Sequence, residues 1–191
     1  MIIGVDIDGV LAEFVQAFAE YYNSKHGTKV SKEHFFSYNF WEVLGGTRES
    51  AVREVMQFYE TAYFRGIQPI RGSQEGVAAL SQHQLVVITS RPHVVHDETK
   101  KWVERHFPQM FKSIYLTNEW SEAGKGQMKP DVCLELGVDV MIEDSLEYAV
   151  QCAGKGLMVL LLNQPWNRAS ELPERVAIAH SWRDISRYLK T

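Results

Sequence analysis

The sequence predicts an α/β fold: a parallel β-sheet with helices on both faces and a small helical insertion after the first strand. Short runs of β-branched and aliphatic residues alternate with amphipathic helical patterns along most of the chain. Several of these runs end in acidic or hydroxyl side chains, as expected where the carboxyl ends of parallel strands form a binding site. One aromatic-rich segment near the N-terminus shows no strand pattern, which favours a helical insertion there.

Composition narrows the function classes. The chain has 191 residues, of which 45% are hydrophobic and 12% aromatic, enough for a sizeable core. Its formal net charge of −4 offers no general basic surface for a nucleic-acid backbone. We therefore expect a small-molecule substrate and no nucleic-acid polymer as partner.

The cysteines and the lengths of the apolar runs indicate the cellular compartment of the protein. Cys133 and Cys152 lack a CxxC partner and lie in apolar stretches, which predicts buried free thiols in a reducing compartment. No run reaches the roughly 18 apolar residues that span a membrane, and Asp6 and Asp8 interrupt the N-terminal run, unlike in a signal peptide. We expect a cytoplasmic protein without a membrane partner. A homodimer is compatible with the sequence, which leaves the oligomeric state open.

The first strand is predicted over residues 1–5 and ends in two carboxylates, Asp6 and Asp8. Alternation along an extended chain turns both carboxylates to one face, and Gly9 lets the chain leave the strand sharply. Two close carboxylates are tolerated when they share a proton or bind a cation, and Mg²⁺ is the natural hard cation. Reading Asp6 and Asp8 as solvated turn residues would leave the apolar strand before them unexplained.

Helical patterns follow this strand. Apolar residues recur with helical period over residues 11–26 and stop at Gly27. Residues 28–67 are rich in aromatics, and Ser31 and Thr47 are candidate N-caps of a short and a longer helix. We assign residues 12–65 to a helical cap and residues 1–11 and 66–191 to the catalytic core.

An insertion at this point lies above the catalytic edge of the sheet, where it can exclude water and select substrate. Most of its aromatic residues are expected to form its own core. We expect Phe14, Phe40 and Trp41 to be exceptions that bind substrate. A flat aromatic platform suits a nucleobase, whose stacking is worth about 1–3 kcal/mol.

The next strand, predicted over residues 85–88, runs into Thr89, Ser90 and Arg91. Two hydroxyls at a strand end, with adjacent backbone N–H groups, can hold phosphate oxygens. Arg91 is either a further phosphate contact or a surface residue, and the sequence leaves both interpretations open.

A last acidic pair, Glu143 and Asp144, follows an apolar strand that begins near residue 138. Since neighbouring strand residues point to opposite faces, one of the two is expected to reach a metal directly. Lys129 lies just upstream, with Lys125 as the alternative lysine. Further elements are expected as a helix that Ser73 caps and that runs through Leu80, a strand over 113–117, a helix over 146–153, a strand over 158–162 and a final helix capped by Ser181.

Taken in order, the acid pair of Val-Asp-Ile-Asp-Gly-Val, the pair Thr89-Ser90, Lys129 and the pair Glu143-Asp144 resemble the four motifs of the haloacid-dehalogenase superfamily of phosphohydrolases. The resemblance implies a Rossmann-like core with a cap. It also implies Mg²⁺ as cofactor, with Asp6, the backbone carbonyl of Asp8, and Asp144 as ligands. Glu143 would contact the ligands of the metal or bind the metal through water.

The resemblance further implies a mechanism. Asp6 would attack phosphorus to give an aspartyl-phosphate, while Asp8 protonates the leaving alcohol and later activates water. Thr89, Ser90 and Lys129 would steady the charge on the phosphoryl oxygens.

Within the superfamily, the chain is most similar to the 5'(3')-deoxyribonucleotidase group. Its opening from Asp6 to Phe14 matches that group, and Phe40-Trp41 resembles an aromatic pair of the group's cap. The resemblance implies a nucleoside monophosphate as substrate. Glu143 and the stretch 163–168 depart from the group's pattern.

Two other interpretations stay open. The run Glu143-Asp144-Ser145 is also typical of sugar-phosphate phosphatases and mutases of the superfamily, and a noncatalytic metal- or phosphate-binding protein would keep the same fold. The sequence has no GxGxxG, GxxxxGK[ST] or GxSxG motif and no zinc pattern among its histidines.

Overall fold

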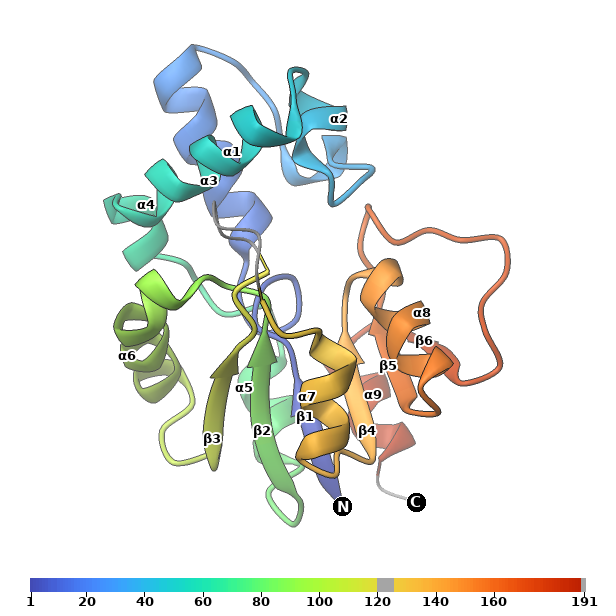
Figure 1. Ribbon diagram of the computed structural model, residues 1–191. Helices are drawn as coiled ribbons and strands as arrows, with labels where there is room; N and C mark the ends of the chain where they lie inside the picture. The colour runs from blue at the N-terminus through green and yellow to red at the C-terminus, as the bar shows by residue number, and fades with distance from the viewer. Residues whose placement is uncertain (120–125, 190–191) are drawn as a thin grey trace.

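The computed structural model describes residues 1–119 and 126–189, and in these ranges the chain forms a six-stranded sheet in the order β3-β2-β1-β4-β5-β6 (Figure 1). All five pairings are parallel. The strands are β1 (Ile2–Val5), β2 (Gln84–Thr89), β3 (Ser113–Leu116), β4 (Val140–Glu143), β5 (Met158–Leu162) and β6 (Val176–Ala179). The sequence therefore predicts the fold class correctly, and the two acidic strands, β1 and β4, are neighbours at the centre of the sheet.

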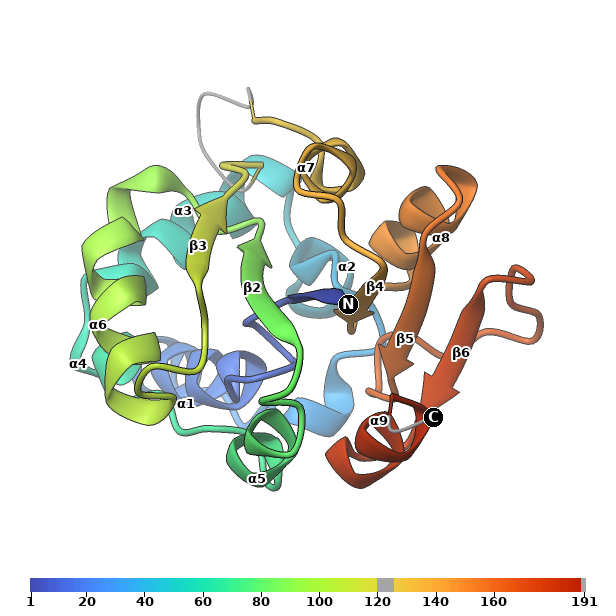
Figure 2. The ribbon, with the colours of Figure 1, turned by 90° about the horizontal axis from the view of Figure 1, so that it is seen from below.

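Two hydrophobic clusters cover the two faces of the sheet, because successive strand residues alternate between them. In β2, Val87 belongs to one cluster and its neighbours Val86 and Ile88 to the other. Figure 2 shows helices α7 and α8 on one side of the sheet and α5 and α9 on the other. The helices that precede, connect or follow the later strands are α5 (Ser73–Ala78), η2 (His93–Val95), α6 (His96–His106), α7 (Lys129–Glu135), α8 (Leu146–Gly154) and α9 (Trp182–Tyr188).

A helical region lies between β1 and α5 and stands over the carboxyl ends of the strands in Figure 1. It consists of α1 (Phe14–His26), η1 (Lys32–His34), α2 (Phe40–Leu44), α3 (Arg48–Tyr59) and α4 (Ala62–Arg65). Thr47 caps α3 by accepting a hydrogen bond from the N–H of Ser50, and Gly27 ends α1 with φ of 67°. These two helix boundaries are confirmed.

Most aromatic side chains of this region pack on one another. The rings of Phe18 and Phe40 lie 4.9 Å apart, and Phe58 meets Phe18 edge to face at 5.5 Å. Phe35, which follows η1, packs edge to face against the rings of Phe18 and Phe40. The helical region thus has its own apolar core, as expected for most of its aromatic residues.

Some elements differ from the sequence prediction. The edge strand β6 was not predicted, because two of its four residues, Val-Ala-Ile-Ala, are alanines, which are poor strand formers. Helix α1 begins at Phe14, since the N–H groups of Leu11 and Ala12 turn back to the carbonyl of Ile7. Helix α5 begins at Ser73 behind Gly72, so Ser73 is its first residue and not its cap.

Both cysteines are buried and free, as expected. Among the residues that the structure describes, no helix has the length and apolar character needed to cross a membrane.

Candidate active site

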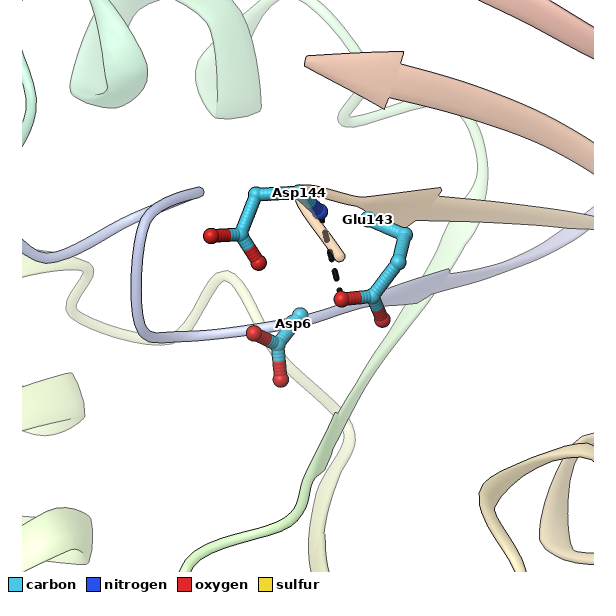
Figure 3. Close-up of side chains that lie close together, drawn as sticks. All are labelled: Asp6, Glu143 and Asp144. Carbon is cyan, nitrogen blue, oxygen red and sulfur yellow. Dashed lines mark hydrogen bonds between the residues drawn. The ribbon is translucent and has the colours of Figure 1, made fainter. Parts of the chain in front are cut away.

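Three carboxylates meet where β1 and β4 end. Val5 and Ile142 are paired in the sheet, so Asp6 and Glu143 follow at the same level, and the N–H of Asp6 donates to the carbonyl of Ile142 at 3.0 Å. One carboxylate oxygen each of Asp6, Glu143 and Asp144 lies within 4.8 Å of the others (Figure 3). All three residues are buried. The parallel register places the ends of two strands side by side, and so it brings Asp6 close to Glu143 and Asp144, which lie 137 and 138 positions later in the chain.

Lys129 supplies the positive charge inside this cluster. Its Nζ lies 3.0 Å from Asp6 Oδ1 and 2.8 Å from Glu143 Oε2, and the side chain is fully buried. Burial disfavours the ammonium, but the charges of Asp6 and Glu143 raise the pKa of Lys129 well above its ordinary value. Lys129 is thus the lysine that the described residues bring to the site, whereas Lys125 lies outside them.

The carboxylates remain in excess over this one ammonium. Burial raises the pKa of Asp6 to about 7, against the opposing effect of Lys129 and with the added repulsion of Glu143 and Asp8. Burial and the charge of Glu143 likewise raise the pKa of Asp144 well above its usual range. Buried oxygen donors with surplus negative charge fit a hard divalent cation such as Mg²⁺.

Glu143 is occupied on both carboxylate oxygens. Oε2 accepts from Lys129, and Oε1 accepts from the backbone N–H groups of Asp144 and Ser145 at 3.2 and 3.1 Å. Glu143 therefore orients Lys129 and braces the turn that carries Asp144. Ser145 caps α8 through its hydroxyl.

Asp8 lies next to the cluster but pairs with Arg91. The guanidinium donates from Nε to Oδ2 at 2.8 Å and from Nη2 to Oδ1 at 2.6 Å, a two-bonded ion pair. Arg91 also donates from Nη1 to Thr99 and lies over the ring of Phe64, and only 2% of it is exposed. The interpretation of Arg91 as a surface residue is wrong; its contact with a substrate phosphate stays a prediction.

Thr89 is the last residue of β2 and is buried, whereas Ser90 is partly exposed just beyond the strand. A small cavity of about 20 Å³ opens beside them. It is lined by Asp8, Phe14, Tyr38, Phe40, Val55, Tyr59, Ser90 and Arg91. The structure thus brings Phe14 and Phe40 next to Asp8, both buried in the helical region.

Trp41 is placed differently. It is half-buried and packs against the apolar core of the helical region, and it does not line the cavity beside Asp8. Neighbouring residues of a helix point in different directions, which lets Phe40 of the short helix α2 line the cavity without Trp41.

Two tyrosines at the site, the partly buried Tyr38 and the buried Tyr59, escaped the sequence analysis. Tyr38 and Tyr59 line the same cavity, and burial followed by the charges of nearby carboxylates raises the pKa of each hydroxyl above its ordinary value. Both therefore remain neutral phenols at the edge of the acidic cluster. Their signal in the sequence was weak, because aromatic residues are common throughout this region.

The loop after β5 was also missed as part of the site. Trp166 donates from Nε1 to Asp144 Oδ2 at 2.8 Å, and Asn167 donates from Nδ2 to the carbonyl of Asp144 at 2.7 Å. Gln164 donates to the carbonyl of Gly9 at 2.7 Å. A signal was available, since polar residues that follow β5 must lie at the same edge of the sheet as those that follow β1 and β4.

There is a steric reason for glycine at position 9. A Cβ at this position would lie 1.9 Å from Asp144 Oδ2, and its φ of +80° disfavours any side chain. The absence of a side chain lets the carboxylate of Asp144 approach the turn after β1.

Comparison with known proteins agrees with this arrangement. Residues 1–190 match the model of the family described as "5' nucleotidase, deoxy (Pyrimidine), cytosolic type C protein". A Bacillus cereus protein named "Putative nucleotidase" is 24% identical over 98% of this chain and 97% of its own length. A Chlorobaculum tepidum protein named "Putative 5'(3')-deoxyribonucleotidase" is 24% identical over 100% of this chain and 90% of its own.

The fold is found in solved structures too. A haloacid dehalogenase-like hydrolase from Streptococcus pneumoniae superposes with a TM-score of 0.70 at 14% identity, covering 98% of this chain and 97% of that one. The fold and the acidic cluster are consistent with the family match, which spans nearly the whole chain. The chain therefore belongs to the 5'-nucleotidase family of deoxy (pyrimidine), cytosolic type C proteins, phosphoric monoester hydrolases with the haloacid-dehalogenase fold.

Proposed function

We propose that this protein is a Mg²⁺-dependent phosphatase of deoxynucleoside monophosphates that works through a phosphorylated Asp6. The observation that carries the proposal is the buried cluster of Asp6, Glu143 and Asp144 around Lys129, with Asp8 beside it. This set holds a nucleophile, a cation site and a second acid at one sheet edge. The family match and the name of the Chlorobaculum relative support the choice of nucleotide.

Asp6, Asp144 and the backbone carbonyl of Asp8 would hold the cation. When bound, Mg²⁺ would neutralise the phosphate charge so that an anionic nucleophile can approach. Glu143 would contact it through water at most, because both of its carboxylate oxygens already accept hydrogen bonds.

In the first half-reaction, a carboxylate oxygen of Asp6 attacks phosphorus while the bond from phosphorus to the leaving oxygen breaks. Asp8 gives its proton to the leaving alcohol. The ammonium of Lys129 stays beside Asp6, where it offsets the negative charge that gathers on the phosphoryl group. Thr89 and Ser90 would donate to the remaining phosphoryl oxygens.

In the second half-reaction, Asp8 takes a proton from water, and the resulting hydroxide attacks the phosphoryl group on Asp6. Inorganic phosphate leaves and the Asp6 carboxylate is restored. Because Arg91 holds both oxygens of Asp8 in the ground state, we propose that substrate binding draws the guanidinium from Asp8 toward the phosphate. Such a movement frees Asp8 to carry a proton.

We further propose that residues 12–65 act as a cap over a core of residues 1–11 and 66–191. A cavity of about 20 Å³ beside Asp8 is far smaller than the few hundred Å³ that a nucleotide needs, so the cap must open to admit one. Phe14 and Phe40 would then face the base, whereas Trp41 would act from outside the cavity or through packing.

The small cavity also favours a second candidate, a phosphatase of small sugar phosphates, whose substrates would need less opening. The test is phosphate release with Mg²⁺ from a panel of nucleoside 5'- and 3'-monophosphates and sugar phosphates, with Asp6→Asn as control. Turnover of deoxynucleotides that Asp6→Asn abolishes supports the proposal. Turnover of sugar phosphates alone keeps the mechanism and replaces the substrate, and turnover that survives in Asp6→Asn overturns the mechanism.

A further inference from the structure

Trp166 binds the carboxylate of Asp144 directly. Its indole Nε1 donates to Asp144 Oδ2 at 2.8 Å, and both side chains are buried. Figure 3 shows one oxygen of Asp144 pointing toward Asp6 and the other away from it. A donor on Oδ2 restricts rotation of the carboxylate about its side-chain bond, so the orientation toward Asp6 and Glu143 depends on Trp166.

The loop that carries Trp166 is held in place on both sides of the ring. Asn167 Nδ2 donates to the carbonyls of Asp144 and Leu162, both at 2.7 Å. Asn167 Oδ1 accepts from the N–H of Gln164, whose own Nε2 donates to Gly9 at 2.7 Å. These bonds tie the loop to the turns after β1 and β4, so the indole N–H is aimed by the backbone as well as by its own rotamer.

The same indole ring touches the cap. Tyr38 meets it edge to face at 5.8 Å, and Lys32 Nζ lies 5.7 Å from its centre. Lys32 in turn pairs with Glu13 at 2.7 Å, just before α1. Trp166 therefore contacts a cation-site carboxylate at its N–H and the cap segment 32–38 with its ring.

We propose that Trp166 is a positioning residue, which holds Asp144 in the orientation that binds the divalent cation and couples that orientation to cap residues 32–38. The inference rests on the proposed cation site of Asp6 and Asp144. Partners that orient a metal ligand typically account for about 10- to 100-fold in metal affinity. Trp166 provides such a partner, and its ring also contacts Lys32 and Tyr38 of the cap.

The first experiment measures Mg²⁺ binding to the metal-free full-length chain by calorimetry, in wild type, Trp166→Phe and Trp182→Phe. Phenylalanine at 166 keeps an aromatic ring against Tyr38 and Lys32 but removes the N–H. Trp182→Phe is a matched control, since Trp182 is also buried and donates from Nε1 to the carbonyl of Val10 at 2.9 Å. We expect Mg²⁺ to bind Trp166→Phe about 10- to 100-fold more weakly than wild type, and to bind Trp182→Phe nearly as wild type does.

A second measurement uses the wild-type chain and does not depend on the variant folding. In ¹H–¹⁵N spectra, the indole N–H signal of Trp166 should move most among the five tryptophans when Mg²⁺ is added. Single phenylalanine variants at the other four positions assign it by elimination. The backbone signals of Lys32 and Tyr38 should move as well.

The outcomes separate this inference from the proposed function. If wild type binds no divalent cation, both the proposed cation site and the role of Trp166 are wrong. If wild type and Trp166→Phe bind Mg²⁺ equally, or the Trp166 indole signal does not respond, the cation site stands and the positioning role is overturned. Equal weakening in Trp182→Phe would also overturn it, by showing a general effect of lost packing.

Discussion

The guanidinium of Arg91 holds both carboxylate oxygens of Asp8, although the two residues are 83 positions apart in the chain. Both side chains are largely buried, so water cannot replace either partner if the other is removed. Removing one partner of a buried ion pair leaves an uncompensated charge, which is more destabilising than removing both. The mutual dependence of Asp8 and Arg91 is therefore open to a direct test.

We predict that Arg91→Met lowers the free energy of unfolding by about 3–5 kcal/mol, because the Asp8 carboxylate stays buried without its partner. Asp8→Asn combined with Arg91→Met should recover most of that loss. Urea denaturation of wild type, both single variants and the double variant measures the coupling. Additive effects of the two substitutions would show that the pair does not stabilise the fold.

The raised pKa of Asp6 predicts a pH-dependent stability in the metal-free protein. The pKa is about 7 in the folded chain against an ordinary value of 3.8, so the folded state holds the proton more tightly. The resulting stabilisation is complete below about pH 4 and is lost as the pH rises through about 7. Asp6→Asn cannot ionise, so it should gain stability relative to wild type between these two pH values.

Unfolding midpoints of wild type and Asp6→Asn, measured in EDTA at pH 5 and pH 8, check this prediction. Titrating groups remote from Asp6 cancel in the difference between the two proteins. Saturating Mg²⁺ should reduce the difference at pH 8, because a bound cation stabilises the ionised Asp6. A difference that does not change with pH would contradict a raised pKa.

Gly9 should tolerate no side chain. In Gly9→Ala, the new Cβ would lie 1.9 Å from Asp144 Oδ2 at a φ of +80°, so the carboxylate must move and Mg²⁺ binding should be lost. Gly27→Ala is the matched control, since Gly27 also has a positive φ, of +67°, but no atom within 4 Å of its Cβ. Gly27→Ala should cost about 1 kcal/mol of stability and leave Mg²⁺ binding intact. Calorimetry and urea denaturation of both variants decide between a steric and a purely conformational role.

Phe14 and Trp41 should differ in their effect on substrate binding. Phe14→Leu changes a wall of the cavity beside Asp8, so we expect KM for deoxynucleoside monophosphates to rise several-fold while KM for a small sugar phosphate changes little. Trp41→Leu alters a residue that does not line this cavity and should change KM less. Steady-state kinetics on both substrates measure the contrast. A larger KM change in Trp41→Leu would indicate that the cap rearranges to bring Trp41 to the substrate.

Local sequence patterns were enough to predict many of the residues of the candidate site. Asp6 and Asp8 follow an apolar strand, Glu143 and Asp144 follow another, and carboxyl ends of parallel strands share one edge, so their proximity could be predicted before any coordinates. The order of these motifs with Lys129 also led to the right family. What the sequence pattern could not predict was the edge strand β6, because two of its four residues are alanines; the equally short edge strand β3, with its isoleucine and tyrosine, was predicted.

The chemical groups at the ends of the central strands could be predicted from the amino-acid sequence, because strand periodicity and the parallel sheet fix the edge that each side chain reaches. The pairing of these groups became visible only in the folded structure. Arg91 pairs with Asp8. Trp166, in a loop that follows another strand, donates a hydrogen bond to Asp144. Such partnerships depend on loop conformation and on the packing of side chains remote in sequence, and no local pattern encodes either.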